Sequence, residues 1–276
     1  MTLSSRLWLI GGTSESVALA IAFTHQHLPC TVSVTTAAAQ VRYPQNPLLR
    51  VVVGQFQPED LPAFLEQEQI GAILDASHPY ATGISQLAIT MAAEYHLPYL
   101  RFERGKLTGS TQGSSDSAVR SVASLATWLA GANLLGQRVL LTLGSKALPQ
   151  FLPWQERCTL FARILPTSAA LQAAASGGFK RDRLFALFPP ISHDLERALW
   201  QHWQISMVVT KASGQPGGEA IKRQVAAELG VTLIVIQRPR LVYPQQTSDL
   251  EVAIAFGKQW VSGHLTHWAC NQIRHA

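Results

Sequence analysis

The sequence is poor in cysteine: its 276 residues include only Cys30, Cys158 and Cys270. These lie far apart with no C-x-x-C spacing, which excludes a zinc finger and is typical of a protein in a reducing compartment. No group of His, Cys, Asp and Glu residues has metal-ligand spacing, so we expect no metal site in the protein. Together these absences predict a cytoplasmic location.

Charged residues are also scarce, at 14% of the sequence. The 22 Lys and Arg residues are dispersed among 17 Asp and Glu residues, for a formal net charge of +5. Because no basic block is present, nucleic acid is not an expected partner. The small positive excess instead favours an anionic small molecule, or no specific partner.

No apolar run is long enough to predict a membrane span. Two uncharged stretches, residues 16–41 and 121–137, are interrupted by His, Gln, Pro, Gly and Asn residues. The first apolar run follows a single arginine and leads directly into a glycine pair, so a cleaved signal peptide is not expected. The 47% content of apolar residues predicts a folded protein of one large or two ordinary domains.

A glycine pair interrupts the first predicted strand and precedes a helix. A short apolar run leads into Gly11 and Gly12, after which Thr13 or Ser14 can cap a helix with Glu15 in its first turn. Such a turn lets the backbone approach an anion, and the new helix presents unpaired N–H groups to it. The segment therefore predicts a phosphate site. Because the pair departs from the G-x-G-x-x-G fingerprint, an ordinary turn is the alternative.

The end of the second predicted strand indicates which nicotinamide cofactor would bind. Residues 31–36 alternate β-branched and small side chains and end in Thr35 and Thr36, with Arg42 nearby and no acid. An acid at this place usually binds the ribose 2′-hydroxyl of NAD, whereas its absence makes room for a 2′-phosphate. The absence of an acid at this strand end therefore favours NADP over NAD as the cofactor. The alternative is a polar turn without a ligand.

Strands and helices alternate along the first part of the chain. Residues 49–53 and 72–75 predict strands with a helix between them, and alternation of this kind predicts a parallel sheet whose ligands lie beyond the carboxyl ends of its strands. His78 and Tyr80 follow the strand at residues 72–75, close to Asp75. They are candidates to face the ligand, and a histidine with a structural role is the alternative.

A polar, Gly- and Ser-rich stretch at residues 106–117 predicts a linker, which divides the chain into residues 1–112 and 113–276. A second α/β series follows, and a second glycine-rich loop begins at Lys211 between a predicted strand and a helix. We expect two Rossmann-like domains with parallel sheets flanked by helices, and an active site in the cleft between them.

Five polar segments stand at the ends of predicted strands. In chain order they are Gly11-Gly12-Thr13-Ser14-Glu15, Asp75-Ala76-Ser77-His78-Pro79-Tyr80-Ala81, Glu103-Arg104, Leu143-Gly144-Ser145-Lys146, and Thr210-Lys211-Ala212-Ser213-Gly214 with Gly217, Gly218 and Lys222. As a set they resemble the precorrin-6A reductase family of cobalamin biosynthesis, which includes the cobalt-precorrin-6A reductases. The Asp-x-x-His-Pro-aromatic-Ala segment is the most specific of the five.

The resemblance implies an NADPH-dependent reduction of one double bond of precorrin-6A, giving precorrin-6B or its cobalt form. The implied substrate is an anionic tetrapyrrole, which agrees with the small positive charge, and other cobalamin-pathway enzymes are the implied protein partners. Three positions depart from the family's pattern. Ser77 stands where Thr is usual, Tyr80 where Phe is usual, and Ala212 where Asn is frequent, which removes a hydrogen-bonding side chain.

Site roles follow from the loops and from the resemblance together. The expected cofactor-binding residues are Gly11, Gly12, Thr13, Ser14 and Glu15 at the pyrophosphate, Thr35 and Thr36 near the 2′-phosphate, and Ser77, His78 and Pro79, with Tyr80, near the nicotinamide. The expected clamp on substrate or cofactor comprises Glu103, Arg104, Lys211, Ser213, Gly214, Gly217, Gly218 and Lys222. The candidate proton donors are His78, Tyr80 and Lys211, and water is the alternative.

Three other functions remain open from the sequence. The chain could be an NADP-dependent reductase of another substrate, which would bind NADPH without affinity for tetrapyrroles. It could be a non-catalytic NADP-sensing module, which would bind the cofactor without turnover. A two-domain tetrapyrrole protein like the uroporphyrinogen-III synthases would need no nicotinamide and would tolerate loss of Gly11 and Gly12.

Overall fold

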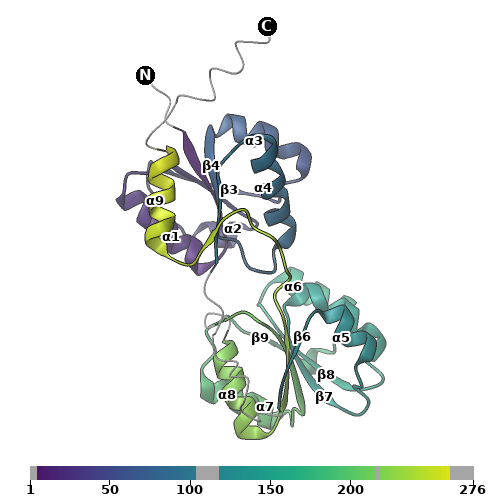
Figure 1. Ribbon diagram of the computed structural model, residues 1–276. Helices are drawn as coiled ribbons and strands as arrows, with labels where there is room; N and C mark the ends of the chain where they lie inside the picture. Colours follow the sequence, from purple (N-terminus) through teal and green to yellow (C-terminus); the bar gives the residue numbers. More distant parts are fainter. Residues whose placement is uncertain (1–4, 104–117, 215–217, 262–276) are drawn as a thin grey trace. The chain divides into compact units, whose positions relative to one another are not determined.

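The computed structural model describes residues 5–103, 118–214 and 218–261 (Figure 1). The chain divides into two compact units. Unit 1 contains the chain up to Gly105 and again from Arg240, and unit 2 contains Lys106–Pro239. Each unit is a parallel sheet with helices on both faces, which confirms the predicted fold class. None of the helices in the described part of the chain is long and apolar enough to cross a membrane.

Unit 1 has a six-stranded parallel sheet in the order β12-β5-β4-β1-β2-β3. Its strands are β1 (Arg6–Ile10), β2 (Cys30–Val34), β3 (Leu49–Val53), β4 (Ile70–Asp75), β5 (Tyr99–Phe102) and β12 (Gln246–Thr247). Its helices are α1 (Ser14–His25), α2 (Ala37–Gln40), the 3₁₀ helix η1 (Pro58–Asp60), α3 (Leu61–Gln67), α4 (Thr82–Glu94) and α9 (Leu250–Val261).

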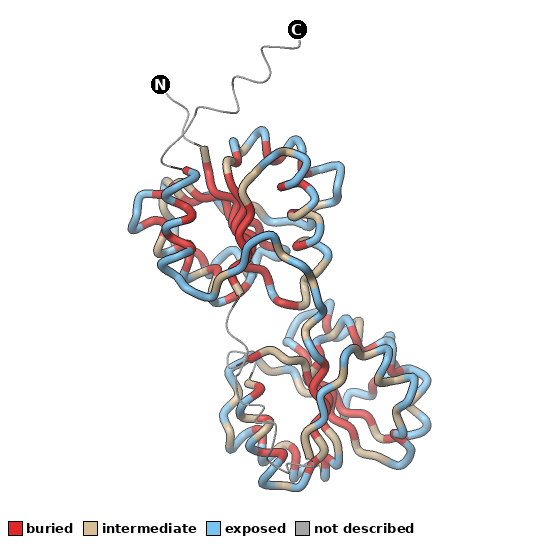
Figure 2. The backbone as a smooth tube through the Cα atoms, viewed as in Figure 1, coloured by how far each residue is buried: buried red, intermediate tan, exposed pale blue. Residues whose placement is uncertain are grey.

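The central strand β1 shows how the sheet of unit 1 is covered. All of its residues are buried, because successive side chains point to opposite faces and both faces carry helices (Figure 2). Leu7 and Leu9 belong to the core cluster that includes residues of α1 and α9. Trp8 and Ile10 belong to the cluster that includes residues of α3 and α4. This double burial holds the end of β1, and the glycine turn beyond it, in a fixed place.

Unit 2 has a second six-stranded parallel sheet, in the order β6-β11-β10-β7-β8-β9. Its strands are β6 (Val119–Val122), β7 (Arg138–Thr142), β8 (Thr159–Ile164), β9 (Leu184–Ala186), β10 (Met207–Lys211) and β11 (Thr232–Ile236). Its helices are α5 (Leu125–Gly131), the 3₁₀ helix η2 (Ser145–Trp154), α6 (Ser168–Ser176), the 3₁₀ helix η3 (Arg181–Arg183), α7 (His193–His202) and α8 (Glu219–Leu229).

The two sheets share one topology. In unit 1 the chain runs outward from β1 through β2 to β3, and then continues on the other side of β1 with β4 and β5. In unit 2 it runs from β7 through β8 to β9, and then to β10 and β11 on the other side of β7. The strand order therefore reverses beside β1 in one unit and beside β7 in the other. Ligands of open parallel sheets bind at such reversal points.

The chain after unit 2 returns to unit 1. Strand β12 pairs with β5, and α9 packs against α1 and the sheet. A Cβ on Gly257 would lie 3.2 Å from Leu28 Cδ1, so the glycine allows α9 to approach closely. The sequence predicts residues 240–261 in the second domain, and here the structure differs: an amphipathic helix is compatible with either sheet, and this one completes the core of unit 1. The predicted boundary at residue 112 lies outside the described residues.

Candidate functional site

The turn after β1 has no room for side chains at its first position. A Cβ on Gly11 would lie 2.4 Å from Tyr43 Oη and 3.2 Å from the carbonyl oxygen of Ser33. Gly12 has a φ of +100°, a backbone conformation that residues with a side chain rarely adopt. The Gly12 N–H donates to Tyr43 Oη at 2.9 Å, and that hydroxyl also hydrogen-bonds to Ser16 Oγ at 2.7 Å. Tyr43 therefore fixes the shape of the glycine turn.

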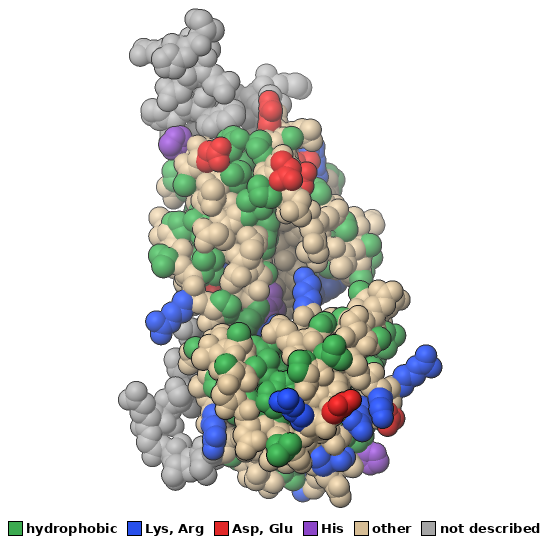
Figure 3. All heavy atoms as spheres, turned by 90° about the vertical axis from the view of Figure 1, so that its right-hand side faces the viewer, with side chains coloured by type: hydrophobic (Ala, Val, Ile, Leu, Met, Phe, Trp, Pro, Cys, Tyr) green, Lys and Arg blue, Asp and Glu red, His purple; other side chains and the backbone are tan. Residues whose placement is uncertain are grey.

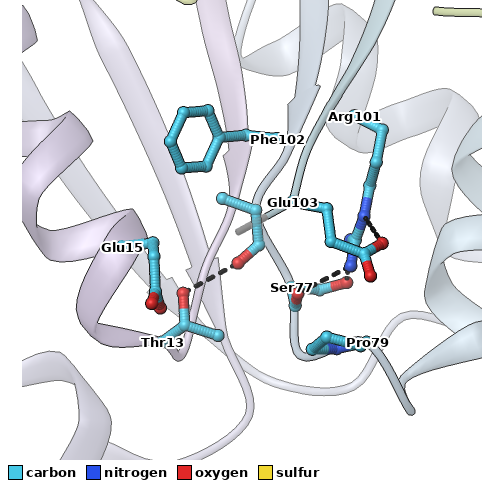
Figure 4. A pocket seen from close by; sticks show the side chains of 8 residues that line it. Thr13, Glu15, Ser77, Pro79, Arg101, Phe102 and Glu103 are labelled. Atoms are coloured by element: carbon cyan, nitrogen blue, oxygen red, sulfur yellow. Dashed lines mark hydrogen bonds and ion pairs between the residues drawn. The ribbon is translucent and has the colours of Figure 1, made fainter. Parts of the chain in front are cut away.

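Thr13 caps α1 and joins two loops of the sheet edge. The Ser16 N–H donates to Thr13 Oγ1 at 3.1 Å, and the Thr13 N–H donates back to Ser16 Oγ at 3.0 Å. This reciprocal cap satisfies donors that a helix start leaves unpaired. Thr13 Oγ1 also donates to the carbonyl oxygen of Ala76 at 2.8 Å, a bond drawn in Figure 4. The loops after β1 and β4 are thereby held together.

A buried ion pair organises the loop after β4. Asp75, the last residue of β4, and Arg101 of β5 are both fully buried, and Arg101 NH1 lies 2.8 Å from Asp75 Oδ1. Arg101 also donates to Ser77 Oγ at 3.0 Å and to the Ser77 carbonyl at 3.1 Å, while the Ser77 N–H donates to Asp75 Oδ1 at 2.9 Å. Arg101 Nε contacts Glu103 Oε2 at 3.3 Å. The pair thus fixes the backbone and side chain of Ser77.

Electrostatics keep this network in one protonation state. Burial alone lowers the pKa of Arg101, but the surrounding acidic groups, Asp75 first and then Tyr243, Glu103 and Tyr99, together outweigh it and raise the pKa above its ordinary value. The Tyr99 hydroxyl donates to Asp75 Oδ2 at 2.8 Å, and burial and the Asp75 charge raise the pKa of Tyr99. Both groups therefore remain hydrogen-bond donors at neutral pH. The Asp75 carboxylate thus accepts hydrogen bonds from Arg101, Tyr99 and the Ser77 N–H.

The ends of β1, β4 and β5 surround a small hollow of about 10 Å³ (Figure 4). It is lined by Thr13, Glu15, Ala76, Ser77, Pro79, Arg101, Phe102 and Glu103. The hollow thus contains two carboxylates, a guanidinium and one aromatic ring. Five predicted site residues, Thr13, Glu15, Ser77, Pro79 and Glu103, are brought together here, and Gly11, Gly12 and Ser14 lie in the adjoining turn.

His78 and Tyr80 do not line this hollow. His78 is exposed, and its Nδ1 accepts the backbone N–H of Tyr80 at 3.2 Å, so the neutral ring carries its proton on Nε2. The two rings lie 5.7 Å apart between centroids. His78 and Tyr80 belong to the predicted segment after β4, but they lie outside the hollow that Ser77 and Pro79 line.

Thr35 and Thr36 lie at the carboxyl end of β2, which pairs with β1. Both are exposed, and Thr36 Oγ1 accepts the Ala39 N–H at 3.2 Å as the N-cap of α2. Among the described residues of this strand end, none is acidic. The two threonines therefore follow the strand next to the one that leads into the glycine turn.

The predicted clamp residues of unit 2 occupy two different environments. Lys211, at the end of β10, lines a larger hollow of about 410 Å³ together with Lys146 and Arg163. Burial and the nearby charge of Lys146 lower the pKa of Lys211. Lys222 is buried and does not line that hollow, and its Nζ donates to the Gly218 carbonyl at 3.3 Å. Burial and the charge of Arg163 lower its pKa to about 8.

The rest of the predicted clamp surrounds the start of α8. Ser213 follows β10, the Gly214 N–H donates to the buried carboxylate of Glu219 at 3.1 Å, and Gly218 has a φ of +68°. The contact between Gly214 and Glu219 joins the residues after β10 to the first turn of α8. Arg104 and Gly217 lie outside the described residues.

Several site residues were missed from the sequence. Tyr43, Arg101 and Phe102 in unit 1 and Arg163 in unit 2 contact the turn or line the hollows, and Lys146, which belongs to a segment that carries the resemblance but was given no role, also lines the unit 2 hollow. One signal was available: Arg101 and Arg163 interrupt otherwise apolar parallel strands, where a charge needs a buried partner. Within the described ranges, no three His, Cys, Asp or Glu side chains gather as metal ligands would.

A parallel α/β unit with a glycine turn at its reversal point is the architecture of Rossmann-like nucleotide-binding proteins. Comparison with known families narrows this class. The family described as precorrin-6x reductase CbiJ/CobK matches residues 6–258, so the chain belongs to the precorrin-6A reductase family.

Named relatives agree with this assignment. The cobalt-precorrin-6A reductase of Synechocystis sp. is 46% identical over 88% of this chain and 92% of its own length. The precorrin-6A reductase of Rhodococcus erythropolis is 30% identical over 95% of this chain and 99% of its own. A solved structure named CobK precorrin-6A reductase is 23% identical, with a TM-score of 0.73 over 91% of this chain and 95% of that one, and supports the fold.

Proposed function

We propose that this protein catalyses the NADPH-dependent reduction of one double bond of cobalt-precorrin-6A to cobalt-precorrin-6B. The observation that carries the proposal is the 46% identity, over most of both chains, with a relative named for that substrate. Metal-free precorrin-6A is the second candidate, because the Rhodococcus erythropolis relative is named for it. Cobalt is part of the substrate in this scheme, so the reaction needs no metal ligands from the protein.

The glycine turn of unit 1 is the proposed site of the NADPH pyrophosphate. The N–H groups of Gly12 and Thr13 already donate to Tyr43 Oη and Ser16 Oγ. We therefore assign the phosphate oxygens to the N–H groups of Ser14 and Glu15 in the first turn of α1, where the helix dipole also favours negative charge. The 2′-phosphate is assigned to Thr35 and Thr36, because an acid that would repel it is absent from that strand end among the described residues.

The nicotinamide half of the cofactor is assigned to the hollow beside Ser77 and Pro79. At about 10 Å³ the hollow has space for about one water molecule, so a ribose or the carboxamide would lie against its rim rather than inside it. Glu15 and Glu103 supply carboxylate oxygens that accept hydrogen bonds from ribose hydroxyls or a carboxamide amine. The Asp75–Arg101 pair keeps Ser77 in place and so orients the ring for hydride transfer.

Reduction of a double bond by hydride also needs one proton. His78, Tyr80 and Lys211 are the candidate donors. The pKa of Lys211 is lowered by burial and by Lys146, and an amine whose pKa lies closer to neutral is a more effective acid at pH 7. Lys211 is therefore the preferred donor, and water is the alternative.

Steady-state turnover under anaerobic conditions tests the proposal. Purified protein is mixed with NADPH and either cobalt-precorrin-6A or precorrin-6A, and the product is identified by mass. A product two mass units heavier than the tetrapyrrole substrate, from the addition of one hydride and one proton, supports the proposal and shows which substrate is used. Binding of NADPH without any change in either tetrapyrrole contradicts it and favours another substrate or a sensing role. Function in the cytoplasm beside other cobalamin-pathway enzymes remains part of the proposal.

A further inference from the structure

Unit 2 has its own reversal point, and a second hollow lies there. The order β10-β7-β8 repeats the order β4-β1-β2 of unit 1, so β7 is the topological counterpart of β1. The hollow of about 410 Å³ is lined by residues at the carboxyl ends of β7, β8, β9 and β10. Open parallel sheets bind ligands at this place, and the volume exceeds that of the unit 1 hollow.

Three cations from three adjacent strands line this hollow. Lys146 follows β7, Arg163 belongs to β8, and Lys211 ends β10. Adjacent strands lie about 4.8 Å apart, so the cations are distributed across neighbouring rows of the sheet edge. No Asp or Glu is among the described residues that line the hollow. The repulsion between Lys146 and Lys211, seen in the lowered pKa of Lys211, would be relieved by a bound anion.

An ion pair with a buried carboxylate holds Arg163 in place. Its NH1 lies 2.5 Å from Oε2 of Glu196, a residue of α7 that is 2% exposed. The other oxygen of that carboxylate has no hydrogen-bond partner within the described ranges. Glu196 therefore acts as a buried anchor that keeps the guanidinium at the hollow, where its remaining N–H groups match a carboxylate.

The wall of the hollow is apolar. Ile164 and Leu165 at the end of β8, and Leu187, Pro189 and Ile191 after β9, supply this surface. Leu165 is 47% exposed on this wall and can contact a ligand. A ligand that fits must combine a broad apolar face with carboxylates at its edge.

The distribution of charge between the two units also favours an anionic ligand in unit 2. Unit 2 contains 14 of the 22 Lys and Arg residues and 7 of the 17 Asp and Glu residues, an excess of seven positive charges. Unit 1 contains the remaining 8 basic and 10 acidic residues, an excess of two negative charges. On the face shown in Figure 3, Lys and Arg side chains gather on unit 2. The positive charge of the chain therefore belongs to the unit with the larger hollow.

We propose that the hollow of unit 2 binds the carboxylate-bearing edge of the tetrapyrrole substrate, with Lys146 and Arg163 as carboxylate-binding residues beside Lys211. The inference rests on the proposed function and adds the location and the residues of substrate recognition. The competing anion is a phosphate of NADPH, and the experiment separates the two.

The test compares Lys146→Gln with Lys180→Gln. Both residues are exposed lysines of unit 2, but Lys180 does not line the hollow. Lys146→Gln should raise KM for the tetrapyrrole about tenfold or more, the effect of losing one charge-assisted hydrogen bond, and leave KM for NADPH within about twofold. Lys146→Arg should restore much of the loss, and Lys180→Gln should change neither constant. Arg163→Gln is a less specific test, because it also leaves the Glu196 carboxylate buried without its ion-pair partner.

Three results would overturn the inference. Lys146→Gln could leave both KM values unchanged, as expected for Lys180→Gln. It could raise KM for NADPH instead, which would place a cofactor phosphate in the hollow. The wild-type chain could also fail to bind the tetrapyrrole. Absorbance titration of cobalt-precorrin-6A without NADPH separates failure of the two proposals. Binding that weakens in Lys146→Gln while wild-type turnover is absent supports the hollow and contradicts the reductase proposal. Turnover that Lys146→Gln leaves unchanged contradicts the hollow alone.

Discussion

Arg101 shows how a single side chain holds the edge of the unit 1 sheet. It contacts Asp75, Ser77 and Glu103 while remaining fully buried, and Tyr243 packs over its guanidinium at 5.2 Å from the ring centroid. Buried charge is costly unless it is paired, so this group stabilises the fold only as part of the whole network. The same contacts fix the segment assigned to the nicotinamide. Stability and function therefore depend on the same residue.

Replacing Arg101 with glutamine should lower the free energy of unfolding by about 3–5 kcal/mol, because Asp75 is left buried without its charge partner. Urea unfolding measures the change. Arg50→Gln is the matched control: its side chain is 57% exposed and 3.2 Å from Glu68, so the loss should stay below about 1 kcal/mol. Equal losses in the two variants would show that the Asp75–Arg101 pair contributes no more than a surface pair.

Thr36 offers a direct test of cofactor choice. Thr36→Asp should preserve the N-cap of α2, since aspartate caps helices at least as well as threonine, and add a carboxylate near the proposed 2′-phosphate. KM for NADPH should rise about tenfold or more through charge repulsion, while NADH is affected less. Thr36→Ser keeps the cap without the charge and should behave like the wild type. An unchanged NADPH preference in Thr36→Asp would place the 2′-phosphate elsewhere.

Lys211 is the residue at which proton donation can be separated from charge. Arginine keeps the positive charge but does not release its proton near neutral pH. If Lys211 donates the proton, Lys211→Arg should lower kcat by about a hundredfold or more with a smaller effect on the KM of the tetrapyrrole. Single-turnover rates across pH 6–9 would check this. Retention of kcat within about threefold would indicate that only the charge of Lys211 matters.

At the scale of elements, α9 determines which unit the C-terminal segment completes. Phe256 is buried in the core cluster of unit 1, whereas Val252 on the same helix is 48% exposed. Phe256→Ala should destabilise unit 1 by about 3–5 kcal/mol and reduce hydrogen-exchange protection in β1 and β4, leaving β7 and β10 unchanged. Val252→Ala should cost less than about 0.5 kcal/mol. Loss of protection in β7 instead would contradict the assignment of α9 to unit 1.

Most elements were predictable because local patterns determine them. β3 has the bounds that the sequence predicts, and β2 and β4 differ from their predicted bounds by one or two residues at their ends. β6 and α6 are among the elements that local patterns did not predict. The edge strand β6 exposes its central Arg120 and Ser121, and α6 buries only small residues, Ala170 and Ala174, so neither carries a periodic stripe of large apolar side chains.

The candidate site was predictable to the extent that it is local. The glycine turn, the cap by Thr13 and the segment around Ser77 follow from neighbouring residues. The partners of Arg101 and Tyr43 do not follow from neighbouring residues, because Asp75 lies 26 residues from Arg101 and Gly12 lies 31 from Tyr43. Only the parallel sheet brings these residues together. For Lys146 and Arg163 the same holds, since the order of β7, β8 and β10 in unit 2 is not apparent from local patterns.

At the scale of the whole molecule, two units of one topology differ in charge and in the size of their hollows. Unit 1 combines a glycine turn with a small polar hollow, and unit 2 combines a basic excess with a large, partly apolar one. We infer a division of labour in which unit 1 binds the nucleotide and unit 2 binds the anionic macrocycle. Family membership supports the reaction, and the charges of the units support this division.

The most direct test of the central claim is an anaerobic single-turnover experiment with equimolar protein, NADPH and cobalt-precorrin-6A, repeated with precorrin-6A. The account predicts that the nicotinamide absorbance disappears with the same rate constant as the change in the tetrapyrrole chromophore, one NADPH for each ring reduced. It also predicts a slower reaction with NADH. Loss of neither absorbance with either tetrapyrrole, despite saturating NADPH, would contradict the claim that this protein is a precorrin-6A reductase.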